Sequence, residues 1–152
     1  MSIEVGQSAP EFALLDSDKN KVNLADFKGK NVLLLFYPQA FTSVCTKELC
    51  DVRDDIGRYS NATAEVFGIS VDSVFTLKKY KEEQQYNFPL LSDFAKREVS
   101  AAYGVLIPAA GVANRSTFVV DKEGKIVYIE EGNTAIDPTG AETACSRTAH
   151  KE

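Results

Sequence analysis

The sequence predicts an α/β fold, with a central sheet of mixed strand direction and helices on both of its faces. Apolar runs of strand length alternate along the chain with segments of helical periodicity. A turn-rich hairpin precedes the first buried run, and a second hairpin follows the last helix. The chain has 152 residues, 44% of them hydrophobic and 26% charged, which suits one domain of ordinary size.

The N-terminal part of the chain supplies a β-hairpin and the first buried strand. The apolar residues 12–15 and the segment Val22-Asn23-Leu24 flank the turn-rich segment 16–20, a pattern typical of a hairpin. Residues 32–37 form a continuous apolar run that ends at Pro38. Such a run is typical of a strand that is covered on both faces.

Helices and strands alternate through the rest of the chain. In the segment 42–59, apolar residues spaced by three, four and three positions trace one helical stripe. Asp72 and Ser73 are suitable N-caps for a later helix. The elements expected after the first helix are a strand at 66–71, a helix around 75–80, a short strand at 89–91, a helix at 94–103 and a hairpin of strands at 117–121 and 126–129.

Charge and hydropathy exclude several classes of protein. The 17 basic and 22 acidic residues give a net charge of -5, whereas nucleic-acid binders usually carry a clustered basic face. The longest apolar run, 32–37, is far shorter than the roughly 20 residues that span a bilayer. The start of the chain has neither the basic nor the apolar region of a signal peptide. We therefore expect no nucleic-acid partner, no membrane partner and no secretory signal.

The composition changes after residue 131. In the segment 132–152 the apolar side chains are Ile136, Cys145 and small alanines, so a helix there would have little apolar surface to bury. We expect one domain over residues 1–131, followed by a weakly ordered tail.

The cysteine and histidine content limits the possible chemistry. Cys45, Cys50 and Cys145 are too few and odd in number for a secreted disulfide framework, and none is spaced as C-x-x-C. A reducing compartment, the cytoplasm, fits this content best. The single histidine, His150, lies two residues from the C-terminal end, which argues against a Cys-His pair, a Ser-His-Asp triad and a histidine metal site. We expect no metal.

Cys45 is the candidate nucleophile, because it follows the buried strand 32–37 and lies near the start of the helix 42–59. Free backbone N–H groups and the positive end of a helix dipole favour the reactive thiolate at such a place. The alternative is that Cys45 simply packs on the apolar stripe of its helix. Pro38, Thr42 and Cys45 form the pattern P-x-x-x-T-x-x-C, and this pattern favours the reactive cysteine.

The pattern resembles the peroxiredoxins, thiol peroxidases built on a thioredoxin fold, and is closest to their bacterioferritin comigratory protein branch. The resemblance runs from residues 6–12 through the Pro-Thr-Cys loop to residues 115–121. Ser43 replaces a proline often found there, and relatives usually end in an amphipathic helix instead of this tail. The resemblance implies a thioredoxin-like fold, no cofactor, a hydroperoxide substrate and a thioredoxin-like reductant.

The resemblance also implies residue roles: Cys45 is the peroxidatic cysteine, Thr42 holds the peroxide, Pro38 shields the thiolate and Arg115 comes from a neighbouring strand. A thiolate attacks one peroxide oxygen while the other leaves with growing negative charge, and N–H groups, a hydroxyl and a guanidinium stabilise that charge. Each residue has another reading. Thr42 could be a helix N-cap. Arg115 could form a surface ion pair or lie at a solvated strand end. Glu48 could orient the arginine or complement the helix dipole.

Cys50 resembles the resolving cysteine of relatives that carry it in the same helix. On an α-helix, a spacing of five residues rotates Cys50 by about 140° around the helix axis from Cys45 and puts their Cα atoms roughly 8.7 Å apart. A disulfide tolerates a Cα distance of at most about 7 Å. The pair can therefore bond only after the first helical turns unwind. Cys145 is the other candidate, because a flexible tail could reach Cys45 in its own or another subunit.

The expected function is the reduction of hydrogen peroxide and organic hydroperoxides through a sulfenic acid at Cys45 and then a disulfide, recycled by a thioredoxin-like donor. A second hypothesis is a peroxide-responsive redox sensor or binding module, in which oxidation changes a partner interface. A general disulfide oxidoreductase is disfavoured by the missing C-x-x-C. The sequence fits a monomer or a homodimer.

Overall fold

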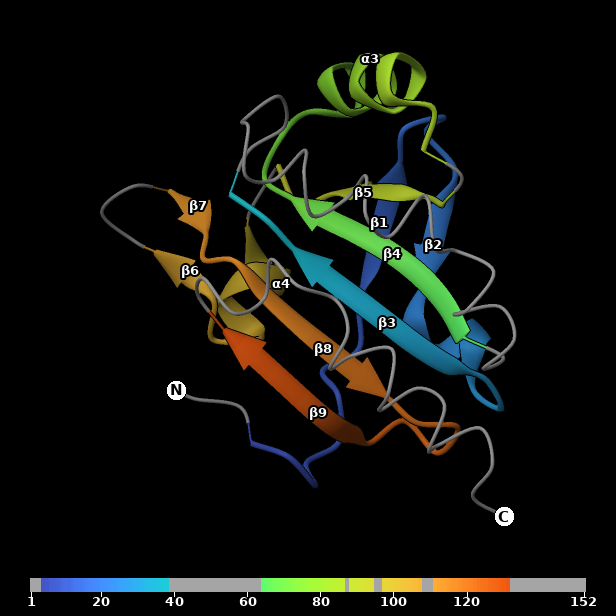
Figure 1. Cartoon of the computed structure of the whole chain (residues 1–152), viewed down its shortest axis with the longest axis vertical. Helices are drawn as coiled ribbons and strands as arrows, with labels where there is room; N and C mark the ends of the chain where they lie inside the picture. The colour runs from blue at the N-terminus through green and yellow to red at the C-terminus, as the bar shows by residue number, and fades with distance from the viewer. Residues whose placement is uncertain (1–3, 39–63, 87, 95–96, 108–110, 132–152) are drawn as a thin grey trace.

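The computed structural model describes residues 4–38, 64–86, 88–94, 97–107 and 111–131. A seven-stranded sheet of the order β2-β1-β5-β4-β3-β8-β9 forms its centre (Figure 1). In chain order its strands are β1 (Ala13–Asp16), β2 (Lys21–Asn23), β3 (Asn31–Phe36), β4 (Ala64–Ser70), β5 (Leu90–Ser92), β8 (Ser116–Val120) and β9 (Ile126–Glu131). A separate two-stranded pair, β6 (Leu106–Ile107) and β7 (Val112–Ala113), precedes β8.

The strand directions are mixed, as the sequence predicts. The strands β3, β4 and β5 run parallel to one another, while β8 pairs antiparallel with both β3 and β9. The N-terminal hairpin of β1 and β2 joins the same sheet through an antiparallel contact of β1 with β5. The predicted N-terminal and C-terminal hairpins are therefore both confirmed.

Every residue of β3 is buried, because this strand lies between β4 and β8 and both of its faces are covered. Side chains alternate between the two faces of a strand, so Phe36 and Leu35 point to opposite sides of the sheet. The apolar run that ends at Pro38 thus forms the central strand, in agreement with its uninterrupted hydrophobicity.

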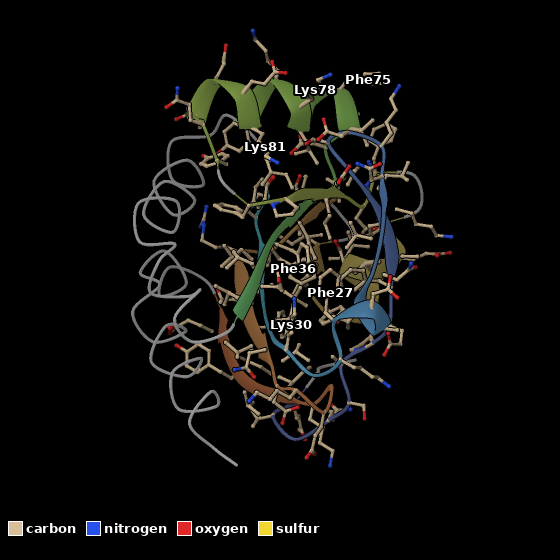
Figure 2. All side chains as sticks on the ribbon, turned by 90° about the vertical axis from the view of Figure 1, so that its right-hand side faces the viewer. Phe27, Lys30, Phe36, Phe75, Lys78 and Lys81 are labelled. Atoms are coloured by element: carbon tan, nitrogen blue, oxygen red, sulfur yellow. The ribbon has the colours of Figure 1, made fainter. Side chains whose placement is uncertain are left out.

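The two described helices contribute aromatic side chains to opposite sides of the sheet. The helix α4 (Glu98–Ala102) lies on the face of Phe36, where Tyr103, directly after the helix, has its ring centroid 5.3 Å from that of Phe36. The helix α3 (Val74–Gln84) contacts the opposite side, where the ring centroid of Tyr80 lies 6.3 Å from that of Tyr37. Figure 2 shows α3 across one end of the sheet, with the exposed Lys78 on it.

The larger core lies on the Phe36 face. It also receives Leu24 from the short 3-10 helix η1 (Leu24–Phe27), while Phe27 packs edge-on to Phe67 with centroids 5.0 Å apart. Its other buried members are Ala9, Phe12, Val32, Leu34, Ile69, Leu91, Val99, Tyr103, Val105, Ala113, Phe118, Val120 and Ile126. These residues come from every described range of the chain, so this core joins segments that are distant in sequence.

Of the two residues predicted as N-caps of α3, one caps the helix. Ser73 is the N-cap, and its hydroxyl accepts a hydrogen bond of 3.3 Å from the backbone N–H of Thr76. Asp72 instead accepts a 2.7 Å hydrogen bond from the hydroxyl of Ser70. The serine thus satisfies one of the free N–H groups at the helix start.

The helix expected at 94–103 is too long, because α4 begins only at Glu98 and ends at Ala102. The buried carboxylate of Asp93 accepts hydrogen bonds from the backbone N–H groups of Val99, at 3.3 Å, and Ser100, at 2.7 Å. Arg97 takes a left-handed conformation, with φ 55° and ψ 25°, which a continuous helix from Phe94 would not contain. A side-chain cap from outside the helix therefore sets its start.

The helix predicted at 42–59 and the tail predicted at 132–152 lie outside the described residues. In the part of the chain that is described, no helix has the length and apolarity needed to cross a membrane.

Candidate active site

The last paired residues of β3 and β8 define the candidate site. Phe36 pairs with Ser116, the first residue of β8. Because the strands are antiparallel, Tyr37 and Arg115 occupy the next position along the two chains. Each lies two positions from a member of the pair Leu35 and Thr117. Because side chains alternate along a strand, all four belong to one face of the sheet.

Arg115 is half-buried, and its Nε atom is buried. Its backbone is fixed on both sides, since Ser116 belongs to β8 and the N–H of Asn114 donates a 2.6 Å hydrogen bond to the carbonyl oxygen of Val105. The β6–β7 pair connects α4 to this point, so the arginine follows a structured hairpin. A guanidinium whose backbone is fixed in this way can stabilise negative charge without a large rearrangement of the chain.

Pro38 directly follows the buried strand and is half-buried. The preceding residue, Tyr37, extends the sheet by one hydrogen bond of 3.1 Å from its N–H to the carbonyl oxygen of Ile69 in β4. Pro38 therefore lies at the carboxyl edge of the parallel strands, which is where ligands commonly bind in α/β sheets. The register brings Pro38 and Arg115 to this same edge.

The other site residues predicted from sequence lie outside the described part of the chain. They are Thr42, Cys45, Glu48 and Cys50, between β3 and β4, and Cys145, after β9. Within the described residues, no group of three or more histidine, cysteine, aspartate or glutamate side chains could hold a metal ion.

Tyr37 and Gly68 are neighbours of the site that the sequence analysis did not identify. Tyr37 is fully buried, and a Cβ atom on Gly68 would lie only 3.3 Å from the Cε1 atom of Tyr37. The alternation of side chains along 32–37 could have assigned Tyr37 to the face of Arg115, but only after β8 was known to be the neighbouring strand.

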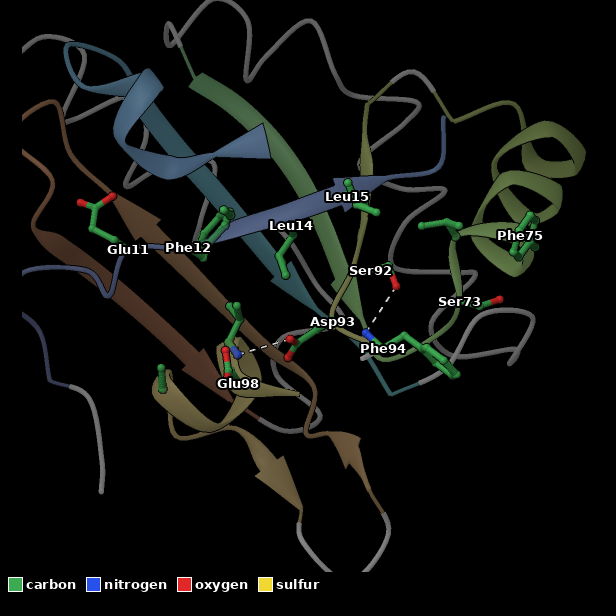
Figure 3. Close-up of a pocket in the computed structure, with 14 residues that line it drawn as sticks. Glu11, Phe12, Leu14, Leu15, Ser73, Phe75, Ser92, Asp93, Phe94 and Glu98 are labelled. Atoms are coloured by element: carbon green, nitrogen blue, oxygen red, sulfur yellow. Dashed lines mark hydrogen bonds between the residues drawn. The ribbon is translucent and has the colours of Figure 1, made fainter. Parts of the chain in front are cut away.

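A hollow of about 720 Å³ lies on another part of the surface, between β1, α4 and the start of α3 (Figure 3). Its walls are mostly apolar, and Phe75 and Phe94 are exposed beside it. The Asp93 carboxylate that faces it is occupied in capping α4. Neither Pro38 nor Arg115 lines this hollow, so the described part of the predicted site is separate from it.

Comparisons with known proteins identify the family and similar folds. Residues 5–129 match the AhpC/TSA family. Alkyl hydroperoxide reductase E of Mycobacterium tuberculosis is 44% identical over 130 residues, covering 84% of this chain and 85% of that protein. Peroxiredoxin Bcp of Escherichia coli K12 is 36% identical over 133 residues, covering 84% and 85%. The crystal structure of peroxidoxin BcpB from M. tuberculosis superposes with a TM-score of 0.89 at 30% identity and covers 99% of both chains.

Proposed function

The chain belongs to the AhpC/TSA family of peroxiredoxins and is a thiol peroxidase, and on this basis we propose that Cys45 is its peroxide-reducing cysteine. The observation that carries the proposal is the register of β3 and β8. It brings Arg115 beside the end of the strand from which the segment containing Cys45 continues. The P-x-x-x-T-x-x-C spacing of Pro38, Thr42 and Cys45 supports the same site.

In the first step the Cys45 thiolate attacks one oxygen of the hydroperoxide. A sulfur–oxygen bond forms, the oxygen–oxygen bond breaks, and the departing oxygen takes up a proton as water or an alcohol. The sulfur is thereby oxidised to a sulfenic acid. Arg115 and the Thr42 hydroxyl stabilise the negative charge that develops on the oxygens, while Pro38 shields the thiolate from water.

In the second step the thiol of Cys50 attacks the sulfenic acid, so that a disulfide forms and water leaves. About 8.7 Å between Cα atoms in a regular helix is too far for this bond. In the helix predicted at 42–59, the turns between Cys45 and Cys50 would therefore have to open first, and the opening of a helix end is among the less costly local unfolding events. Cys145 is the competing resolving residue.

A thioredoxin-like dithiol protein then reduces the disulfide by thiol–disulfide exchange. Hydrogen peroxide and organic hydroperoxides are the proposed substrates, and the cytoplasm is the proposed location, because reducing conditions keep three thiols of this kind available. A monomer or a homodimer can carry out these steps, since every proposed residue belongs to one chain.

The decisive experiment treats the purified, reduced chain with one equivalent of peroxide and follows Cys45 by mass spectrometry. A gain of one oxygen, followed by loss of water as the disulfide forms, is expected. Steady-state peroxide consumption with a thioredoxin donor is measured alongside, because a sensor would be oxidised without sustained turnover. If Cys45 remained reduced while peroxide was consumed, the proposed nucleophile would be wrong.

A further inference from the structure

Gly68 lies in the middle of β4, where the sheet leaves no room for a side chain. It is flanked by Leu35 of β3 and Leu90 of β5 in the parallel register. A Cβ atom at Gly68 would lie 2.8 Å from Leu90 Cδ2, 3.3 Å from Tyr37 Cε1 and 3.6 Å from Phe88 Cε2. The first distance is too short for real Cβ atoms, and the second requires Tyr37 to move by a few tenths of an ångström.

The ring of Tyr37 rests over this glycine and begins a series of packed aromatic side chains. Its centroid lies 6.3 Å from that of Tyr80, which in turn lies 5.1 Å from Tyr86. Tyr86 packs 5.4 Å from Phe88, and all four rings are buried. Because packed interiors have little free volume, a push on the Tyr37 ring is transmitted to its backbone.

The backbone of Tyr37 leads directly into the candidate site. Its N–H is bonded to Ile69 in β4, the strand that contains Gly68. Pro38 follows it, and Arg115 occupies the neighbouring position on β8 by the register of Phe36 with Ser116. A displacement of the Tyr37 backbone would therefore act first on its neighbours, Pro38 along the chain and Arg115 across the strand pair.

We propose that Gly68 is a positioning residue for peroxide reduction, because its missing side chain gives the Tyr37 ring the place that sets the geometry of Pro38 and Arg115. This inference rests on the proposed function. Reactive groups must be held closely, since a misplacement of about 1 Å can cost about 10²-fold in rate. A shift of a few tenths of an ångström is therefore expected to lower the rate about tenfold.

The test replaces Gly68 with alanine and measures the second-order rate constant for peroxide by following the oxidation of Cys45. We expect Gly68→Ala to react about tenfold more slowly than the wild type. The pH at which Cys45 becomes half-reactive toward iodoacetamide is measured on the same samples. We expect it to rise, because a displaced Arg115 favours the thiolate less.

Two further variants separate positioning from packing. Val66→Ile adds one carbon two residues earlier on the same face of β4, where the partner is Leu33, and it should leave the rate within twofold of the wild type. Gly68→Ala/Leu90→Val removes the contact at 2.8 Å but keeps the one with Tyr37. We expect this double variant to recover thermal stability without recovering the rate. It also replaces the single variant if Gly68→Ala does not fold.

Two outcomes would overturn the proposal. One is a Gly68→Ala rate within twofold of that of Val66→Ile. The other is recovery of both rate and stability in Gly68→Ala/Leu90→Val, which would make Gly68 a packing residue only. Cys45→Ser is included in each series, because retained peroxide consumption in that variant would instead overturn the proposed function.

Discussion

Phe36, the last residue of β3, is paired with Ser116, the first residue of β8, and the residues of the candidate site directly adjoin this pair. Tyr37 and Pro38 follow on one strand, and Arg115 precedes the other. Two segments about 80 residues apart in sequence are thereby joined at a fixed register. The central sheet therefore determines where the arginine lies relative to the end of β3.

Replacement of Cys45 by serine should abolish peroxide turnover and leave the fold intact. The chemistry needs a thiolate, and a serine hydroxyl at this position would stay protonated. Peroxide consumption is measured with a thioredoxin donor, and circular dichroism checks the fold. Cys145→Ser is the matched control and should retain turnover. Substantial turnover by Cys45→Ser would contradict the central proposal.

Replacement of Arg115 by methionine should slow peroxide attack by about 10²-fold. The guanidinium favours the thiolate before the reaction and stabilises the peroxide oxygens during it. Arg115→Lys keeps the charge without the planar geometry and should give an intermediate rate. Stopped-flow measurements of the reaction with peroxide provide the rates. Equal rate constants for Arg115→Met and the wild type would exclude this residue from the site.

Replacement of Cys50 by serine should prolong the sulfenic acid at Cys45 and increase its over-oxidation to sulfinic acid. Peptide mapping of the oxidised wild type should find Cys45 bonded to Cys50, and amide hydrogen exchange should increase between them on oxidation. A Cys45 to Cys145 disulfide, with Cys50 as a free thiol, would identify the tail as the resolving element.

Asp93→Ala should lower the free energy of unfolding by about 2 kcal/mol, because it leaves the buried N–H groups of Val99 and Ser100 without their carboxylate partner. Ser73→Ala removes the more exposed cap of α3 and should cost about 1 kcal/mol. Urea denaturation measures both variants. A smaller loss for Asp93→Ala than for Ser73→Ala would show that the α4 cap has little energetic importance.

Stability should fall at alkaline pH because of Tyr103. Burial, with a further contribution from the Glu11 carboxylate, raises the pKa of Tyr103 well above its ordinary value of 10.0. The folded protein therefore keeps the phenol protonated while the unfolded chain ionises, so stability is unaffected below about pH 10 and decreases above it. Urea denaturation between pH 8 and pH 11 should show this loss, and Tyr103→Phe should reduce it.

At neutral pH, Tyr103→Phe should itself cost about 1 kcal/mol, because the hydroxyl donates a 2.7 Å hydrogen bond to the carbonyl oxygen of Pro10. An unchanged slope in Tyr103→Phe would assign the alkaline loss to other groups.

Local patterns predicted most elements of the fold correctly. The apolar run at 32–37 identified the central strand, and Ser73 was correctly expected to cap α3. The predicted start of α4 was wrong, because Arg97 has a left-handed conformation and the helix is capped by Asp93, which precedes it. The β6–β7 pair was missed, since two-residue strands have no readable periodicity.

The site was predictable as a set of residue types, but not as an arrangement. The spacing of Pro38, Thr42 and Cys45 is local and can be read directly. The positions of Arg115 and Gly68 depend on which strands are neighbours, and this is decided by tertiary packing. No local pattern indicates that the Tyr37 ring rests against a glycine of the neighbouring strand, close to Leu90 and Phe88.

The central place of β3 has a consequence for the order in which the protein can assemble during synthesis. Its partner β4 begins 33 residues later at the pair Asn31 and Ala64, but β8 emerges from the ribosome only after 80 or more residues. One edge of a strand that is apolar except for Asn31 therefore stays open while most of the chain is being made. Pairing of such distant segments is slow, so the nascent chain passes through an interval in which this open edge is exposed to aggregation.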